Sequence, residues 1–527
     1  MQRKFGNGSA IKGAIAQLVE QRTENPCVAG SNPAGTTEIP NLTRLGIFLC
    51  LFAYLGLMKS LLTLLFLVTF QLHAQTQKPN IVFILADDLG IGDLGSYDQQ
   101  KISTPNLDKL AASGMRFTQF YAGTSVCAPS RSSLLTGQHT GHTHIRGNKE
   151  IEPEGQEPLA DSIRTFAMIL QEQGYTTGAF GKWGLGMVGT SGDPNRKGFD
   201  EFFGYNCQRQ SHRYYPTHLW HNNQRVDLKG NDLSTKAVYA PALIQEQTLA
   251  FIDQNKERPF FLYVPTVLPH AELAGPEDEF YKKYEDAFEE KAHHGNDYGP
   301  KATVAGYASI EKPRATFAAM VSRMDYYVGE IIDRLEQLGL LENTIIIFSS
   351  DNGAHREGGA DPDFFNSTAG FRGYKRDLYE GGIRTPLLVS WKGHVPAGTT
   401  SSHVGAFWDI FPTIQELTNH SETERTDGIS MLPTWLKQGK QKKHQQLYWE
   451  FHEDGGRQAV RYKNYKLIRF KVKDPANSYY ELYDLEKDPQ EKRPLRNPKL
   501  AQKILKMMEE QHTASEIFPL LPKNTQL

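Results

Sequence analysis

The chain has 527 residues, too many for a single hydrophobic core, which predicts one large domain and a smaller one. Hydrophobic residues make up 39% and charged residues 22% of the chain, a composition typical of a globular protein and unlike a disordered or fibrous one. The 58 Lys and Arg residues nearly balance the 60 Asp and Glu residues, so no net field favours nucleic acid or an acidic membrane as a partner.

A secretory signal peptide is predicted at residues 58–74, where one lysine precedes an apolar run and a short polar exit. Residues 1–57 resemble translated non-coding sequence ahead of a misplaced start codon, and we expect Met58 to be the true first residue. The alternative joins the apolar run to another at 45–57 as one membrane anchor, although Lys59 would be costly inside a membrane. We expect an exported chain, periplasmic or secreted, without stable membrane insertion after signal cleavage.

Alternating strand and helix patterns predict an α/β sandwich. Four apolar runs have the character of buried parallel strands and lie at residues 81–86, 176–180, 260–264 and 344–348. Helical patterns lie at residues 105–113, 159–174, 240–255, 316–338 and 406–418. Strands that alternate with helices imply a large, mostly parallel sheet covered on both faces.

The C-terminal part of the chain has a different pattern. Short aromatic segments at 445–450, 458–462, 465–470 and 479–484 predict a small antiparallel sheet, and residues 498–512 predict a helix packed on it. We expect a large domain at 78–435 and a smaller α+β subdomain at 436–527, with the basic run 438–446 as a solvated loop between them.

Reactive side chains follow all four predicted strands. In chain order they are Asp87 and Asp88, Lys182, His270, and Asp351 with Asn352. Because ligands bind at the carboxyl ends of strands in open α/β sheets, we expect these groups to converge. Each Asp taken alone is better explained as the cap of a helix or turn. Their convergence favours a hard cation that seeks oxygen, calcium or magnesium ahead of zinc, with calcium the better fit.

Cys127 lies in the segment TSVCAPSRSSLLTG at 124–137. Pro129 suits the first turn of a helix, which places Cys127 at the helix N-terminus, where free N–H groups favour an anion. Arg131 in the first turn can donate a planar fork of hydrogen bonds to an oxygen near Cys127. Two structural alternatives stay open at this point, a disulfide between Cys127 and Cys207 and a structural cysteine with an incidental arginine.

The stretch Cys127-Ala-Pro-Ser-Arg131, followed by Leu-Thr-Gly, resembles the C-x-P-S-R signature of the type I sulfatases. The similarity continues through PNIVFILADDLG, TPNLDKLAASGMRFTQFY, GAFGKWGLG, SSDNGA, YEGGIRTP and ELYDLEKDP. The resemblance implies an alkaline-phosphatase-like α/β/α sandwich and an exported sulfatase similar to bacterial glycan sulfatases of the arylsulfatase and N-acetylgalactosamine-6-sulfatase type.

The resemblance also implies roles for individual residues. In this family a maturation enzyme oxidises the motif cysteine to formylglycine, whose hydrate attacks sulfur and leaves a covalent sulfate on the enzyme, so Cys127 is expected to be modified. The implied ligands of one calcium ion are Asp87, Asp88, Asp351 and Asn352. Arg131 and Lys182 are implied to hold the formylglycine and sulfate oxygens, and His270 and Lys375 to contact the sulfate and its bridging oxygen.

One position departs from the family pattern. The family often reads GKWHLG, whereas this chain has GKWGLG, with Gly184 in place of the histidine. The base for the last step is then unassigned, and the candidates are His139, His142, His144 and His212. We favour His142 or His144, although each is also well explained as a structural or surface histidine.

Two other functions stay open. A phosphoesterase or phosphonate hydrolase of the same superfamily would use Ser or Thr as nucleophile and extra His and Asp residues for two zinc ions, and the CAPSR segment argues against it. A non-catalytic binder of sulfated glycans would result if Cys127 were never oxidised. The segment 204–220, rich in aromatics, Arg and His, fits a carbohydrate pocket or a packed structural loop. We expect a sulfated sugar as substrate, galactose or N-acetylgalactosamine in a glycosaminoglycan or mucin.

Overall fold

The computed structural model describes residues 78–521 apart from 234, 296–306 and 421–423, and before them only single positions between 54 and 59. The chain divides into two units, Met1–Thr76 and Gln77–Leu527, and the named strands and helices belong to the second. The predicted signal peptide and the segment before it lie outside the described residues, apart from those single positions. Within the described part of the chain, no helix is long and apolar enough to cross a membrane.

The larger part of this unit is built on a mixed sheet of 11 strands in the order β12-β2-β11-β10-β1-β9-β5-β6-β7-β8, with β13 also paired to β2. The central strands are parallel and confirm the four predicted ones: β10 (Thr344–Ser350), β1 (Asn80–Ala86), β9 (Phe260–Pro265) and β5 (Thr176–Lys182). The others are β2 (Met115–Tyr121), β6 (Glu201–Tyr205), β7 (His218–His221), β8 (Gln224–Asp227), β11 (Arg384–Ser390), β12 (Thr399–Ser401) and β13 (Gly405–Ala406).

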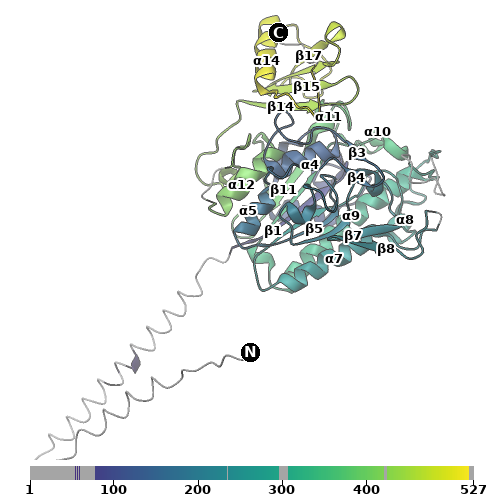
Figure 1. Cartoon of the computed structure of the whole chain (residues 1–527), viewed down its shortest axis with the longest axis vertical. Helices are drawn as coiled ribbons and strands as arrows, with labels where there is room; N and C mark the ends of the chain where they lie inside the picture. Colours follow the sequence, from purple (N-terminus) through teal and green to yellow (C-terminus); the bar gives the residue numbers. More distant parts are fainter. Residues whose placement is uncertain are drawn as a thin grey trace, which may run out of the picture. The chain divides into compact units, whose positions relative to one another are not determined.

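Helices cover both faces of this sheet (Figure 1). One layer contains α3 (Pro105–Ser113), α7 (Ala240–Asn255), α8 (Glu279–Tyr284) and α9 (Pro313–Gln337); the other contains α4 (Cys127–Thr136), α5 (Phe166–Glu172) and α12 (Ile410–Leu417). Along β1, Val82 and Ile84 pack toward the first layer, and Ile81 and Phe83 pack toward the second. Because both faces are buried, the strand is apolar at every position from Ile81 to Ala86. The predicted α/β/α sandwich is confirmed.

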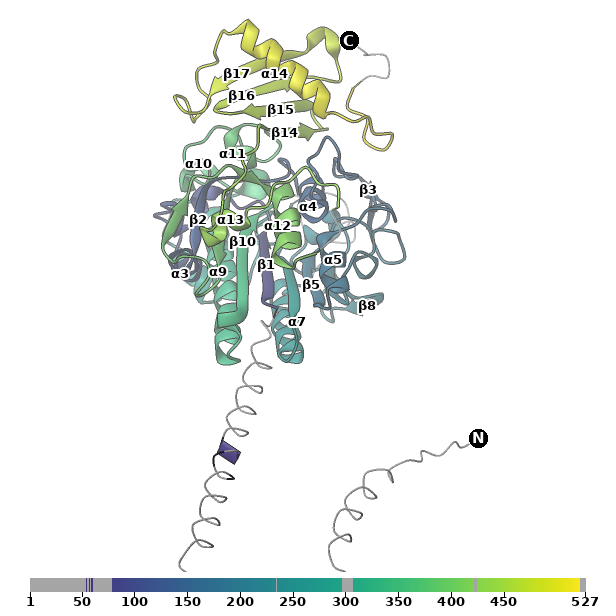
Figure 2. The ribbon, with the colours of Figure 1, turned by 90° about the vertical axis from the view of Figure 1, so that its left-hand side faces the viewer.

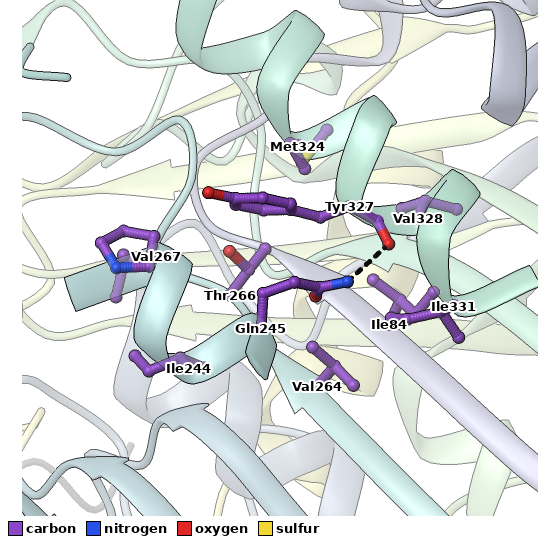
Figure 3. Close-up of a pocket in the computed structure, with 11 residues that line it drawn as sticks. Ile84, Ile244, Gln245, Val264, Thr266, Val267, Met324, Tyr327, Val328 and Ile331 are labelled. Atoms are coloured by element: carbon purple, nitrogen blue, oxygen red, sulfur yellow. Dashed lines mark hydrogen bonds between the residues drawn. The ribbon is translucent and has the colours of Figure 1, made fainter. Parts of the chain in front are cut away.

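A small cavity lies between the first helical layer and the sheet (Figure 3). It encloses about 20 Å³, and its lining includes Ile84, Ile244, Val264, Met324 and Val328. Gln245 Nε2 donates to the backbone oxygen of Tyr327 at 3.1 Å along its wall. A volume of this size holds about one water molecule, so the cavity belongs to the packed core and is too small for a sugar.

The boundaries of two predicted helices differ from the structure. The helix expected at 159–174 is wrong at its start, because α5 begins at Phe166. Thr165 has an extended backbone (φ −113°, ψ 157°), and its Oγ1 caps the helix by accepting from Met168 N at 3.3 Å. The helix expected from 316 begins at Pro313 instead, since proline suits the first helical turn. Short elements elsewhere are β3 (Glu150–Ile151), β4 (Gly155–Gln156), α6 (Gln208–Ser211), α10 (Pro362–Phe365), α11 (Glu380–Ile383) and α13 (Leu432–Leu436).

The C-terminal part forms a second, antiparallel sheet of four strands (Figure 2). Its elements are β14 (Gln446–Phe451), β15 (Arg457–Tyr462), β16 (Tyr465–Phe470), β17 (Tyr479–Asp484) and the helix α14 (Pro498–Gln511). Val460 packs against Ile504 of α14 on one face, whereas Trp449 and Ile468 pack with Trp408 on the other. The predicted small sheet with a helix is confirmed, and the domain boundary at 435/436 stays a prediction.

Candidate active site

The carboxyl ends of the central strands bring together the polar side chains that the sequence singled out. Asp87 and Asp88 follow β1, while Asp351 and Asn352 follow β10, its parallel neighbour. Lys182 is the last residue of β5. All five residues are 0% exposed, so their charges and dipoles act on one another in a medium that screens them weakly.

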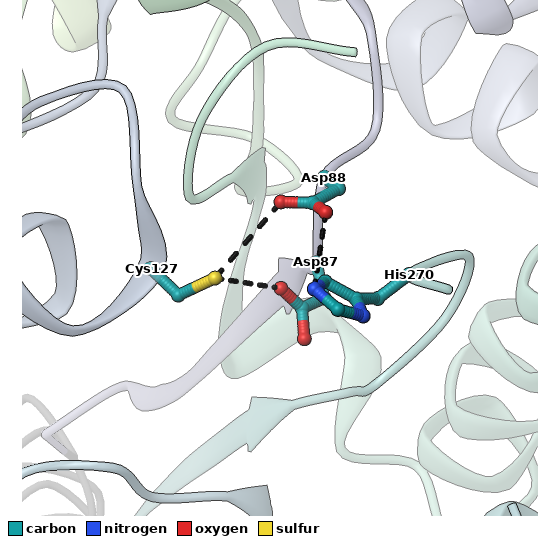
Figure 4. A group of neighbouring side chains, drawn as sticks. All are labelled: Asp87, Asp88, Cys127 and His270. Carbon is teal, nitrogen blue, oxygen red and sulfur yellow. Dashed lines mark hydrogen bonds and ion pairs between the residues drawn. The ribbon is translucent and has the colours of Figure 1, made fainter. Parts of the chain in front are cut away.

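Cys127 is the first residue of α4 and faces two of these carboxylates (Figure 4). Its Sγ lies 3.4 Å from Asp87 Oδ1 and 3.9 Å from Asp88 Oδ1. Burial raises the pKa of the thiol well above its usual value, which makes unmodified Cys127 a neutral and poor nucleophile. Cys127 and Cys207 are both free and buried, so the disulfide alternative is wrong.

Arg131 and Lys182 bring positive charge to the same place. Arg131 donates from Nε and Nη2 to Asp351 Oδ2 at 3.0 and 2.8 Å, and from Nη1 to the backbone oxygen of Lys182 at 2.6 Å. Lys182 Nζ lies 2.7 Å from Asp87 Oδ2. Burial disfavours both charges, but the carboxylates of Asp87 and Asp351 outweigh it and raise the pKa of both groups. Two permanent cations therefore flank the carboxylates that Cys127 faces.

His270 and Lys375 meet at Asp88. Lys375 Nζ lies 2.8 Å from Asp88 Oδ2, 2.8 Å from His270 Nε2 and 2.7 Å from Glu357 Oε2. The Nδ1 of His270 contacts the backbone oxygen of Ala271, so we assign the ring proton to Nδ1 and let Nε2 accept from Lys375. Burial, followed by the charge of Lys375, lowers the pKa of His270 well below its usual value. Burial opposes the charge of Lys375, but Asp88 and Glu357 raise its pKa well above the usual value.

The carboxylate edge has the donor atoms that a hard cation requires. Asn352 donates from Nδ2 to Asp88 Oδ1 at 2.7 Å, and its own Oδ1 is buried without a hydrogen-bond partner in the described part of the chain. Burial, with help from Asp87, raises the pKa of Asp351 to about 7, which indicates negative charge that the protein alone does not fully compensate. The side-chain oxygens of Asp87, Asp88, Asp351 and Asn352 therefore fit a divalent cation such as calcium.

The missing base stays unassigned, and the preference for His142 or His144 stays a prediction. His142 Nδ1 lies 2.8 Å from Asp427 Oδ1, beyond the C-terminal end of α4, whereas Cys127 begins that helix. His139 stacks on His142 with ring centroids 4.2 Å apart. His144 interacts with the backbone of Pro158 and is influenced by Glu157. After His142 the chain runs back along α4, because Thr143 Oγ1 lies 2.6 Å from Ser132 Oγ and the backbone N–H of Ala128 donates to Asn148 Oδ1 at 3.1 Å.

Further residues complete the cluster around His270. His212 stacks on His270 with centroids 4.8 Å apart and planes at 8°. Glu357 accepts from Tyr307 Oη at 2.7 Å as well as from Lys375. The sequence marked His212 as only one of four candidates and missed Glu357 and Tyr307. Inspection of the residues after β10 could have found Glu357, whereas Tyr307 carries no signal in its local sequence.

Most of the chain matches two known family models. Residues 79–420 match the model of the Sulfatase family, and residues 371–516 match that of the N-sulphoglucosamine sulphohydrolase C-terminal domain. The chain belongs to the sulfatase family. It is a sulfuric ester hydrolase, and the resemblance carried by its motifs is confirmed.

Relatives and solved structures agree with this assignment. Arylsulfatase G of Homo sapiens is 32% identical over 450 residues, which cover 76% of this chain and 78% of the relative. N-acetylgalactosamine-6-sulfatase of Homo sapiens is 31% identical over 385 residues, which cover 68% of this chain and 66% of the relative. The structure of Ps i-CgsB in complex with k-i-k-neocarrahexaose is 28% identical, with a TM-score of 0.67, and the match covers 82% of this chain and 92% of that one. The predicted alkaline-phosphatase-like fold is confirmed.

Proposed function

We propose that this sulfatase removes sulfate from sulfated carbohydrates by means of a formylglycine made from Cys127. The position of Cys127 carries the proposal, because its Sγ starts a buried helix and lies 3.4 Å from Asp87 among fixed cations. A hydrated formylglycine at this position supplies the hydroxyl that displaces the alcohol from sulfur, and its second hydroxyl lets the sulfate leave as the aldehyde reforms. A maturation enzyme is the implied partner during biogenesis.

The residues around Cys127 have separable tasks in this scheme. Arg131 and Lys182 hold the anionic oxygens of the sulfate, since both cations are buried and tied in place by carboxylates. Lys375 lies 2.8 Å from His270 Nε2, and its ammonium group donates to the oxygen that leaves with the sugar while His270 positions it. Charge that develops on the leaving oxygen is thereby offset without any reorganisation of water.

One calcium ion is the proposed metal. Asp87, Asp88, Asp351 and Asn352 would hold it through side-chain oxygens, as the unpartnered Asn352 Oδ1 supports. When bound, the ion supplies positive charge beside the ester under attack. Burial raises the pKa of Asp351, so binding of the ion would favour the ionised form of this carboxyl group.

A sulfated galactose or N-acetylgalactosamine unit of a glycosaminoglycan or mucin is the proposed substrate. Support comes from the N-acetylgalactosamine-6-sulfatase relative and from the neighbour solved with k-i-k-neocarrahexaose. The segment 204–220 lies at the same sheet edge as the site, because β6 is the parallel neighbour of β5. Such a substrate fits an exported enzyme, periplasmic or secreted, for which nucleic acid is no partner.

The proposal is tested by sulfate release from the matured protein. We expect hydrolysis of 4-O- or 6-O-sulfated galactose or N-acetylgalactosamine and none by Cys127→Ala, which should keep the fold because its side chain only shrinks. Faster release of phosphate from matched phosphate or phosphonate esters would favour the phosphoesterase alternative. Binding of sulfated glycan without turnover by a protein whose Cys127 stays a thiol would favour the non-catalytic binder.

A further inference from the structure

Three buried side-chain amides near the catalytic cluster have polar atoms without partners. Gln156 is 0%, Asn206 1% and Gln208 3% exposed. Within the described part of the chain, Gln156 Nε2, Asn206 Oδ1 and both amide atoms of Gln208 make no hydrogen bond. Buried polar atoms are nearly always paired in folded proteins, so several orphans at one place point to a ligand that completes them.

The amides lie at the edge of the sheet that holds the catalytic residues. β5 and β6 are parallel neighbours, so the residues that follow Lys182 and those that follow β6 emerge side by side. The backbone N–H of Gly184 donates to the oxygen of Asn206 at 3.0 Å. Asn206 is therefore held beside Gly184, which follows Lys182 by two residues in the chain. The Nζ atom of Lys182 contacts Asp87 at 2.7 Å.

Gln208 connects this point to His270. It is the first residue of α6, and His212 caps the C-terminal end of that short helix. The ring of His212 stacks on His270 at 4.8 Å. Gln208 thus lies between the strand that carries Lys182 and the loop that carries His270, next to the place where the sulfate is held.

Gly184 makes room for Gln208. The backbone of Gly184 has φ +77°, and a Cβ on it would lie 2.0 Å from Gln208 Nε2. Any side chain at 184 would displace the amide, so glycine at this position and glutamine at 208 depend on each other. The side-chain amide of Gln208 therefore occupies the space that a larger residue at position 184 would fill.

The free atoms have the chemistry of a hydroxyl-binding site. Gln156 Oε1 accepts from the backbone N–H of Gln208 at 3.2 Å, which leaves its Nε2 as a free donor. Gln208 adds one donor and one acceptor, and Asn206 Oδ1 adds an acceptor. Hydroxyl groups both donate and accept, whereas the oxygens of a second sulfate would be repelled by the two acceptors.

We propose that Gln156, Asn206 and Gln208 form the subsite that reads ring hydroxyls of the sugar next to the scissile sulfate. This inference rests on the proposed carbohydrate substrate and adds the residues that select among sugars. A site built to hydrogen-bond a hydroxyl rejects a sugar that lacks it, because the buried polar groups of the site are then left unpaired. Such a site distinguishes ligands more strongly than a site that recognises shape alone.

The hairpin of β3 and β4 carries Gln156 and contacts α6, the helix that begins at Gln208. Its contacts with α6 include the hydrogen bond from Gln208 N and an ion pair between Arg209 and Glu150 at 2.9 Å, with side chains 30% and 31% exposed. The turn of this hairpin is also held by Glu154, whose carboxylate lies 2.7 Å from His218 Nε2 and accepts from Trp220 Nε1 at 2.7 Å.

The test compares Gln208→Met with the wild type on sulfated sugars and their monodeoxy analogues. The probes are 4-O- and 6-O-sulfated galactose and N-acetylgalactosamine, each also without one ring hydroxyl. We expect that removal of the hydroxyl read by Gln208 lowers kcat/KM of the wild type by about tenfold or more. The same removal should change kcat/KM of Gln208→Met by less than about twofold, because the variant has no partner to lose. Gln245→Met is the matched control, since Gln245 is a buried glutamine whose Nε2 already donates to Tyr327.

The inference would be overturned if loss of the hydroxyl lowered kcat/KM by the same factor in Gln208→Met as in the wild type. It would also be overturned if no deoxy analogue lowered kcat/KM of the wild type by twofold or more. The deoxy series needs no variant, so it decides even if Gln208→Met does not fold. Failure of the proposed function looks different, because the matured wild type would then hydrolyse none of the parent sugars.

Discussion

Lys466 supports a buried charge network whose removal should destabilise the protein strongly. Its side chain is 0% exposed, and its Nζ lies 2.9 Å from Glu380 Oε1 and 3.1 Å from Glu491 Oε1. Glu380 also accepts from Tyr121 Oη at 2.7 Å, so this carboxylate joins the C-terminal sheet to the large domain. Burial favours a neutral Glu380, but the charge of Lys466 and the nearby arginines outweigh it and lower its pKa to about 2.

Lys466→Met keeps the length of the side chain and removes the main cation beside Glu380, which leaves Arg384 Nη1 at 3.3 Å as its remaining ion pair. Removal of one partner of a buried ion pair costs about 3–5 kcal/mol, and we expect a loss of that size in the free energy of unfolding. Urea unfolding followed by tryptophan fluorescence measures it, because Trp408 and Trp449 are buried beside this network. Lys503→Met is the control, since Lys503 is exposed and donates to Tyr462 Oη, and it should cost less than about 1 kcal/mol. Equal stability of the two variants would refute the reasoning.

Three further outcomes are expected. Chelation of calcium should lower both activity and melting temperature, and Asn352→Ala should weaken calcium affinity by about tenfold or more in a direct titration, because it deletes one oxygen donor. Burial would raise the pKa of Glu450, but hydrogen bonds with His452 and His512 outweigh it and lower it to about 2. The ionised carboxylate of Glu450 therefore stabilises the fold fully above pH about 4.5, and this stabilisation is lost as the pH falls toward 2. In wild type this group should contribute about 3 kcal/mol to the fall in the free energy of unfolding over that pH range, and Glu450→Gln should lack this contribution. Urea unfolding at several pH values measures the difference. His142→Gln or His144→Gln should cause a large loss of kcat, because one of these residues is the preferred base for the last step, and unchanged turnover of both variants would contradict that preference.

The elements that sequence patterns predicted correctly are those with a strong local signal. β1 and β10 are covered on both faces and read as continuous apolar runs, and the four strands of the C-terminal sheet are marked by aromatic residues close together in the chain. β2 and β11 were missed for different reasons. β2 carries partly exposed polar residues between buried ones, and β11 contains a proline and a register shift between Thr385 and Leu387.

The candidate site was predictable as far as it follows from strand ends and motifs. Asp87, Asp351 and Lys182 converge because the strands that precede them lie close together in the sheet, which strand direction already implies. Tyr307 and Glu357 meet through loops whose paths depend on packing far away in the sequence. For the same reason, the local sequence did not show that the segment after α4 turns back along the helix, where the backbone N–H of Ala128 donates to Asn148 Oδ1 at 3.1 Å.

The most direct test of this account is the mass of the tryptic peptide 117–131, which contains Cys127, after expression with a sulfatase-maturing enzyme. The account predicts a loss of about 18 Da at Cys127, the difference between thiol and aldehyde, together with release of sulfate from a sulfated sugar. An unmodified thiol, under conditions that mature a control sulfatase, would contradict it.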